Sequence, residues 1–106
     1  MGYVDLDMIG WDGDGDRVAE LHTGTGHASN QLGTALIDAN AAYTLGMTFE
    51  RKTTSASRFS DHSPFWDGGY PAVLAIENFF VDDIPGDHSP WYHHTGDTLE
   101  HVDLDY

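Results

Sequence analysis

Two early stretches of the chain, residues 3–9 and 17–23, alternate between apolar and polar side chains and are rich in strand formers. Alternation with a period of two is typical of β-strands that bury one face. Between them, residues 12–16 read Asp-Gly-Asp-Gly-Asp. Glycine accepts positive φ angles and aspartate hydrogen-bonds its own backbone, so this run favours a turn. We therefore expect two strands with a turn between them.

The stretch 28–45 carries apolar residues at helical spacing and predicts the one long helix of the chain. Its apolar positions are Leu32, Leu36, Ile37, Ala41, Ala42 and Leu45. Ser29 or Asn30 is expected to cap the start of this helix, and Gly46 is expected to end it.

The second half of the chain predicts further strands and short helices. Residues 48–53 favour a third strand, and a short helical turn is expected over residues 63–67. Residues 70–76 form a continuous apolar run, which suits a strand that is covered on both faces. Asp97 and Thr98 suit the cap of a final helix. Strands interleaved with helices indicate an α/β fold, with a mixed, mostly parallel sheet in a three-layer arrangement with flanking helices.

Composition narrows the possible partners. The 106 residues suffice for one hydrophobic core and predict a single domain. The chain holds 18 acidic residues against four basic ones, a formal net charge of -14, so nucleic acid is not an expected partner. No stretch approaches the ~20 apolar residues needed to cross a membrane. Because cysteine is absent, a transition-metal site must use histidine, aspartate and glutamate.

Four short segments carry the most specific information. Residues 5–10 read Asp-Leu-Asp-Met-Ile-Gly, residues 60–66 read Ser-Asp-His-Ser-Pro-Phe-Trp, residues 69–73 read Gly-Tyr-Pro-Ala-Val, and residues 92–98 read Tyr-His-His-Thr-Gly-Asp-Thr. In this order they resemble the co-catalytic zinc aminopeptidase family, whose relatives include the glutaminyl cyclases. The resemblance covers most of the chain. It implies a partial zinc-aminopeptidase fold with four adjacent strands, and a parent enzyme that uses two zinc ions to hydrolyse N-terminal residues of peptide substrates.

The resemblance places the metal ligands in the first and last of these segments. It implies that Asp7 binds one zinc ion and that His93, four residues before Asp97, binds the other. Tyr92 matches a catalytic position that stabilises the oxyanion of the tetrahedral intermediate, a role that suits a phenol donor. A ligand at a strand end is well placed, because a rigid sheet aims it into the crevice where open α/β folds bind ligands. The alternative for Asp7 is a turn or capping carboxylate, and His94 is expected to point elsewhere.

Three further residues are candidates for supporting roles. Asp61 and His62 precede an aromatic pair and suit a shell that orients metal ligands or substrate through hydrogen bonds. The alternative is that Asp61 caps a short helix while His62 is partly buried and has its hydrogen bonds satisfied. Glu77 ends the apolar strand and matches an acid found in some family members, and the alternative is a purely structural role.

Two groups of residues invite weaker functional interpretations. Asp12, Asp14 and Asp16 resemble the start of an EF-hand calcium loop, but Arg17 and Thr23 stand where that loop needs glycine and glutamate. A solvated turn is therefore the better interpretation. A set of aromatic residues suits either the wall of an apolar pocket or a packed core. These are Phe65, Trp66, Phe79, Phe80, Trp91 and Tyr92.

The resemblance also shows that several residues of the family's metal site are missing from this chain. In the family, a His-x-Asp pair and an adjacent Glu-Glu pair lie upstream of the Asp-Met-Ile-Gly pattern, and they supply the bridging ligand, the general base and a further ligand. Only six residues precede Asp7 here. One ligand per metal ion is too few to hold zinc tightly, so the chain alone is expected to be inactive. A split or oligomeric site, a non-catalytic binding or assembly module, and a glutaminyl cyclase parent are the alternatives.

The apolar run near residues 71–76 also carries an expectation about assembly. The family layout implies that this strand lies at the seam where further strands would pair. An exposed apolar sheet edge is a template for pairing with another chain. We therefore expect a homo-oligomer that forms through this edge.

Overall fold

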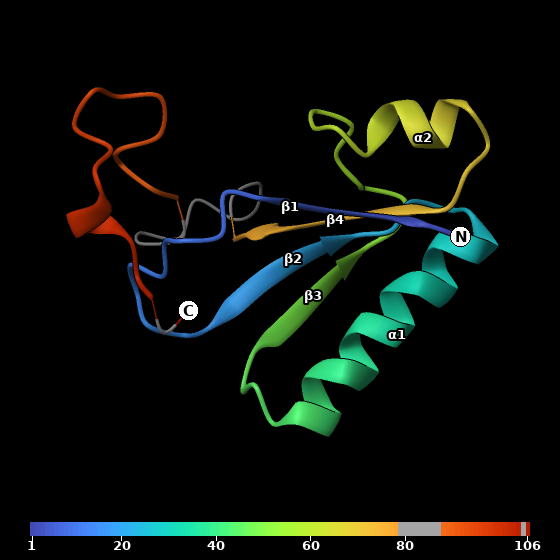
Figure 1. Ribbon diagram of the computed structural model, residues 1–106, viewed down its shortest axis with the longest axis horizontal. Coiled ribbons are helices and arrows are strands. Elements are labelled where there is room, and N and C mark those ends of the chain that lie inside the picture. Colours follow the sequence, from blue (N-terminus) through green and yellow to red (C-terminus); the bar gives the residue numbers. More distant parts are fainter. Residues whose placement is uncertain (79–87, 105) are drawn as a thin grey trace.

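The computed structural model describes residues 1–78, 88–104 and 106. Its elements are β1 (Tyr3–Asp7), β2 (Val18–His22), α1 (His27–Tyr43), β3 (Thr48–Lys52), α2 (Ser63–Asp67), β4 (Ala72–Glu77) and the 3-10 helix η1 (Leu99–His101). Figure 1 shows α1 on one face of the sheet and α2 on the other, which gives three layers. The predicted α/β class and its mixed four-stranded sheet are confirmed.

The strands lie in the order β1-β4-β2-β3. β4 pairs in parallel with β1 and antiparallel with β2, and β2 pairs in parallel with β3. Because β1 and β4 run in the same direction, they end at the same side of the sheet, with Asp7 opposite Ile76. The C-terminal segment lies near this side in Figure 1, whereas β2 and β3 end at the other side, beside the start of α1.

β4 is an interior strand, so the prediction that residues 71–76 form an exposed sheet edge is wrong. All six residues of β4 are buried, and its backbone is paired with β1 on one side and β2 on the other. Its continuous apolar sequence reflects cover on both faces, which is the usual reason for such a run. The edges of the described sheet are β1 and β3. Self-association stays a prediction, but it cannot use β4 as its edge.

The hydrophobic core lies between the sheet and α1. Its fully packed centre is formed by Leu21, Val73 and Ala75, from the two middle strands. The partly buried side chains that pack against this centre are Leu32, Leu36, Ile37 and Phe49. These positions of α1 are the ones that its helical spacing predicts, because residues three and four apart share one face of a helix.

The predicted ends of α1 need correction. Its N-cap is Gly26, with no side-chain capping bond, and its C-cap is Thr44 in a left-handed conformation. Ser29 Oγ instead accepts the backbone N–H at the start of β4 (3.1 Å), and Asn30 Nδ2 donates to the Gly26 carbonyl (3.0 Å). Both polar residues therefore join the helix to its surroundings from inside its first turn. Gly46, with φ 78°, lies in the connection to β3.

The final helix predicted after Asp97 and Thr98 is a single 3-10 turn, η1, whose N-cap Thr98 makes no side-chain capping bond. Neither α1 nor any other helix in the described part of the chain has the length and hydrophobicity that crossing a lipid bilayer requires.

The sheet face opposite α1 is unusually polar. Glu20 and His22 of β2 are both buried there, and their side chains lie 2.7 Å apart. Lys52 of β3 lies 3.6 Å from the second Glu20 oxygen. Burial works against the charge of Lys52, but its hydrogen bond to Glu50 and the charge of Glu20 outweigh burial and raise its pKa. The sheet therefore separates an apolar layer from a layer of buried ionisable groups.

Candidate functional site

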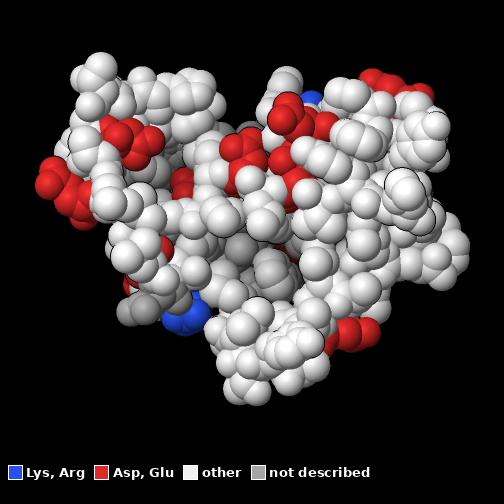
Figure 2. All heavy atoms as spheres, viewed as in Figure 1, with Lys and Arg blue, Asp and Glu red and all other residues white. Residues whose placement is uncertain are grey.

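A cavity of about 300 Å³ lies at the side of the sheet where β1 and β4 end. Three segments that are distant in sequence line it. They are residues 8–11 after β1, Glu77 at the end of β4, and the C-terminal segment with Tyr92 and Asp97. Figure 2 shows acidic atoms around the hollow between the C-terminal segment and α2. Because β1 and β4 pair in parallel, both strands end at one place, which brings these segments together.

Glu77 is the most perturbed ionisable residue of this cavity. It is 3% exposed, and its Oε1 has no hydrogen-bond partner in the part of the chain that the structure describes. Burial, together with the negative charges of Asp97 and Asp7, raises the pKa of Glu77 to about 7 against opposing hydrogen bonds from the Gly10 and Trp11 backbone. Glu77 can therefore hold or release a proton near neutral pH. Its predicted supporting role stays a prediction.

Asp7 is the last residue of β1, next to the lining residue Met8. Its Oδ2 accepts a hydrogen bond from the Ser60 hydroxyl at 2.6 Å. This bond reaches across the fold from the segment before α2, so it is not a local turn or capping bond. Met8 itself has a φ of 54°, a left-handed conformation that turns the chain sharply just after the Asp7 carboxylate.

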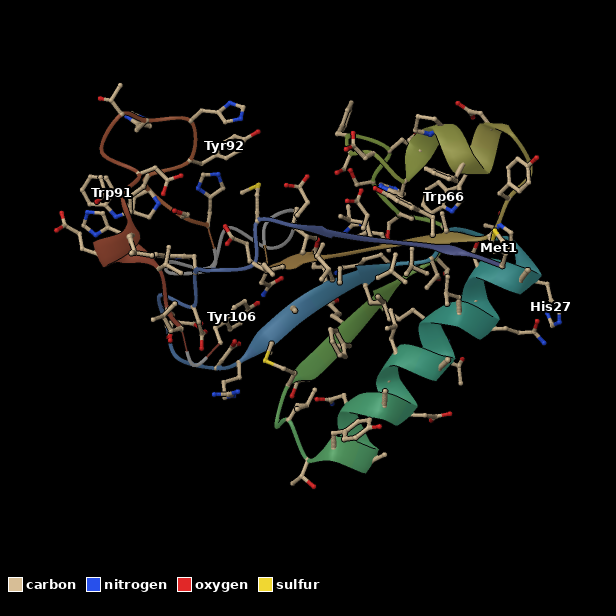
Figure 3. The ribbon with its side chains drawn as sticks, in the orientation of Figure 1. Met1, His27, Trp66, Trp91, Tyr92 and Tyr106 are labelled. Atoms are coloured by element: carbon tan, nitrogen blue, oxygen red, sulfur yellow. The ribbon has the colours of Figure 1, made fainter. Side chains whose placement is uncertain are left out.

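Tyr92 and His93 lie in the C-terminal segment at the same end of the molecule. Their rings stack with centroids 3.9 Å apart, and His88 meets the Tyr92 ring edge-on at 5.9 Å. In Figure 3, Tyr92 extends from the segment toward the side that faces α2, whereas Trp91 lies on its outer side. The metal-ligand roles of Asp7 and His93 and the oxyanion role of Tyr92 stay predictions.

Asp61 and His62 differ strongly in their exposure to solvent. Asp61 is exposed, whereas His62 is fully buried and is the N-cap of α2. The alternative in which Asp61 caps this helix is therefore wrong. His62 Nε2 lies 2.9 Å from the Ser57 carbonyl, and its ring meets Trp66 edge-on at 4.4 Å. The predicted helix over 63–67 is confirmed.

The structure adds three residues that sequence patterns did not single out as site residues. Asp97 lines the cavity and acts on Glu77 through its charge. Asp5 and Ser60 form a hydrogen-bonded group with Asp7. One signal was present in the sequence: Asp5 and Asp7 are two positions apart in a strand, so their side chains share one face.

The three aspartates in the segment before β2 form the local hydrogen bonds that are typical of a turn. Carboxylate oxygens of Asp12, Asp14 and Asp16 lie within 4.8 Å of one another. The Asp12 carboxylate accepts the Arg17 N–H, and Asp16 Oδ1 accepts the Val18 N–H at 2.8 Å. These are the local side-chain to backbone bonds that turns use, which supports the turn interpretation over a calcium loop.

The aromatic residues do not form one pocket wall. Phe65 stacks on Tyr3 beside α2, with ring centroids 4.1 Å apart, whereas Trp91 stacks on a histidine of η1. Phe79 and Phe80 lie outside the described residues. Phe65 is exposed and Tyr92 lines the cavity, so the described members form neither one pocket wall nor part of the hydrophobic core.

The family model for peptidase family M28 matches residues 1–106. The chain belongs to peptidase family M28. Two crystal structures of LapA of Legionella pneumophila, one of which is described as an aminopeptidase, share the fold, with TM-scores of 0.72 and 0.73 at 21% identity. They match 98% of this chain, which in turn spans 26% and 27% of the LapA chains. The curated proteins gave no match. The resemblance found in the sequence is thus confirmed at the level of the family.

Family M28 is generally metal-dependent. Among the described residues, the group of ligand atoms close enough together for a metal ion is that of Asp12, Asp14 and Asp16, whereas three other acidic residues act on one another at the end of the sheet. Asp7, Glu77 and Asp97 concentrate negative charge there, and histidine follows Tyr92. Carboxylate oxygen and imidazole nitrogen are the ligands that zinc accepts when cysteine is absent. The buried Oε1 of Glu77, without a hydrogen-bond partner among the described residues, is a further acceptor that a nearby positive charge would stabilise.

Proposed function

We propose that this chain is the C-terminal part of a zinc-dependent aminopeptidase that hydrolyses N-terminal residues of peptides. Membership of family M28 supports the peptidase class. The observation that carries the finer proposal is the cavity at the ends of β1 and β4, which unites the sequence next to Asp7 with Glu77 and Tyr92. The titratable carboxyl group of Glu77 and the phenol donor of Tyr92 are two of the kinds of group that peptide hydrolysis uses.

Each residue has a distinct task in this proposal. Zinc, when bound, supplies an activated water and polarises the scissile carbonyl. Asp7 and His93 would hold the metal, and the Ser60 hydroxyl at 2.6 Å restricts how the Asp7 carboxylate turns. The Tyr92 phenol donates a hydrogen bond to the oxyanion of the tetrahedral intermediate. Glu77 lies at the edge of the site, where its pKa of about 7 in the metal-free chain lets it hold or release a proton near neutral pH.

The remaining ligands and the general base would come from residues outside this chain. The chain spans about a quarter of LapA, so the complete activity belongs to a larger unit. Asp7 and His93 alone leave each metal ion with one ligand, and a catalytic zinc usually takes three. The other part of a longer polypeptide, a separate chain or a second copy of this chain are the possible sources. We expect the isolated chain to bind zinc weakly and to be inactive.

Zinc titration by calorimetry tests the ligand assignment. Asp7→Asn and His93→Ala should each reduce the weak binding of the wild-type chain, because each removes the one ligand that this chain offers to one of the two metal ions. His94→Ala is the matched control, since it removes the adjacent imidazole and should leave binding unchanged. Equal losses for His93→Ala and His94→Ala would contradict the assignment.

An activity assay tests the incompleteness. The purified chain, with added zinc and a chromogenic leucine amide, should not exceed the His93→Ala control. Turnover above that control would show a complete site, and loss of this turnover on dilution would identify a second copy as the source of the missing residues. A peptide with N-terminal glutamine distinguishes the glutaminyl cyclase alternative, because cyclisation releases ammonia without cleaving the peptide.

A further inference from the structure

Residues 57–62, which we call the clamp segment, are fixed on the polar face of the sheet by two buried histidines. His22 Nδ1 accepts the Ser57 N–H at 2.8 Å, and His62 Nε2 donates to the Ser57 carbonyl at 2.9 Å. A backbone N–H can only donate and a carbonyl can only accept, so these partners fix the role of each ring nitrogen. His22 is 1% exposed and His62 is fully buried, so water does not compete for these bonds.

Asp5 fixes the other end of the clamp segment. It is 7% exposed, and its Oδ2 accepts the backbone N–H of His62 at 2.9 Å. His62 Nδ1 lies 3.5 Å from the same oxygen. The Ser60 hydroxyl, between these two anchored positions, lies 2.9 Å from Asp5 Oδ2 and 2.6 Å from Asp7 Oδ2.

The single proton of the Ser60 hydroxyl can serve only one of the two carboxylates. Asp5 Oδ2 already receives the His62 N–H, and the contact between Ser60 and Asp7 is the shorter of the two. These two facts assign the proton to Asp7. The positions of Asp5 and His62 then determine where the Ser60 hydroxyl lies.

We propose that Asp5 and His62 are positioning residues that hold the clamp segment so that Ser60 donates to Asp7 Oδ2 and sets the direction of the Asp7 carboxylate. The hydrogen-bonded chain runs from the interior of the sheet to the last residue of β1. The role of this hydrogen-bonded chain in catalysis rests on the proposed function, because the direction of the Asp7 carboxylate affects catalysis only if Asp7 binds metal. The hydrogen bonds themselves are independent of that function and can be tested without metal.

The metal-free protein gives the first test, through the ¹³C resonance of the Asp7 carboxyl group. Ser60→Ala should shift this resonance and so define the signal of the lost hydrogen bond. Asp5→Val keeps a strand-forming residue but removes the acceptor, and it should shift the resonance in the same direction. Asp5→Asn should return it toward the wild-type position, because an amide oxygen in the place of Oδ2 still accepts the His62 N–H.

Asp38→Asn is the charge control, since it removes an exposed carboxylate from α1 on the other face of the sheet. An Asp7 resonance that responds to Ser60→Ala but not to Asp5→Val would overturn the proposal. So would a resonance that does not respond to Ser60→Ala.

A second pair of variants covers the case in which Asp5→Val does not fold. His62→Leu removes the ring donor to the Ser57 carbonyl but keeps the backbone N–H that Asp5 accepts. It should shift the Asp7 resonance and speed hydrogen exchange of the Ser57 N–H. His62→Gln, whose side-chain amide can donate to the same carbonyl, should restore both readings. An unchanged Asp7 resonance in folded His62→Leu would count against the role of His62.

Zinc titration tests whether this positioning affects metal binding. Asp5→Val and Ser60→Ala should weaken zinc binding by about 10–100-fold, the usual effect of losing a partner that orients a metal ligand. Asp5→Asn and Asp38→Asn should bind like the wild type. A purely structural role for Asp5 would lower the melting temperature of Asp5→Val without this loss of affinity. If the wild type binds no zinc, the proposed metal site fails, while the carboxyl resonance still decides whether Asp5 and His62 position Asp7.

Discussion

Glu77 shows what burial does to one ionisable residue. Its carboxyl group is almost fully excluded from water, and two neighbouring carboxylates oppose its charge. The sequence predicts a strand end at this position and an acid that matches the family. The burial that raises the pKa of Glu77 cannot be read from the sequence. The same limit applies to Ser60, whose bond to Asp7 joins residues that only the fold brings together. Motif spacing identifies residue positions, whereas tertiary packing determines their electrostatics.

A pH titration of stability tests the environment of Glu77. Its pKa in the folded protein, about 7, lies above the ordinary value of 4.5, so the folded state holds this proton more tightly than the unfolded state. The free energy of unfolding should therefore fall as pH rises from about 4.5 to 7, by at most about 3 kcal/mol. Glu77→Gln should remove this part of the slope, as measured by chemical denaturation in a metal chelator. Glu100→Gln changes an exposed acid and should keep the wild-type slope, and equal slopes for the wild type and Glu77→Gln would refute the prediction.

The elements follow the sequence closely, because each is defined by a local period. The apolar face of α1 and the alternation of β1 and β2 predict their positions to within about two residues of their ends. The ends of α1 were less predictable, since Ser29 and Asn30 form bonds to neighbouring segments and Gly26 takes the capping position. Strand order could not be read from local patterns, because the interior place of β4 depends on pairing with strands distant in sequence.

Gly33 gives a test of how closely α1 approaches the sheet. A Cβ atom at this position would lie 2.5 Å from the Cγ2 atom of Thr23, which is fully buried and branched at Cβ. Gly33→Ala should therefore lower the free energy of unfolding by about 1–3 kcal/mol through overpacking, although alanine favours helices. Gln31→Ala, at an exposed position of the same helix, should change stability by at most about 0.5 kcal/mol. A stabilised Gly33→Ala variant, measured by urea denaturation, would show that the helix can move away.

The charge of the whole molecule is an excess of 14 negative charges on 106 residues. Such an excess destabilises a compact state through self-repulsion, and dissolved salt screens it over about 10 Å at 0.1 M. This property follows from composition alone and needs no structure. The location of the acids does need one, since Asp5 and Glu20 are buried within hydrogen-bonded groups while others are exposed.

Salt should stabilise the folded chain. The midpoint of thermal unfolding is expected to rise as sodium chloride increases from about 0.05 M to about 1 M, because repulsion between surface carboxylates is screened. A variant with Asp38→Lys and Glu100→Lys, which lowers the net negative charge at exposed positions, should show a shallower rise. Differential scanning calorimetry at fixed pH measures both. A midpoint that is independent of salt in the wild type would mean that the surface charges are already compensated.

The interior position of β4 also has a consequence for the order in which the protein folds. β1 is synthesised before the other three strands of the described sheet, yet its partner there is β4, whose first residue follows almost seventy positions later. Contacts between such remote segments form slowly, because the intervening polypeptide must first be confined. During synthesis on the ribosome, β1 therefore still lacks its partner β4 when β2, α1 and β3 are complete. The end of the sheet that carries Asp7 is thus among the last regions to acquire its shape.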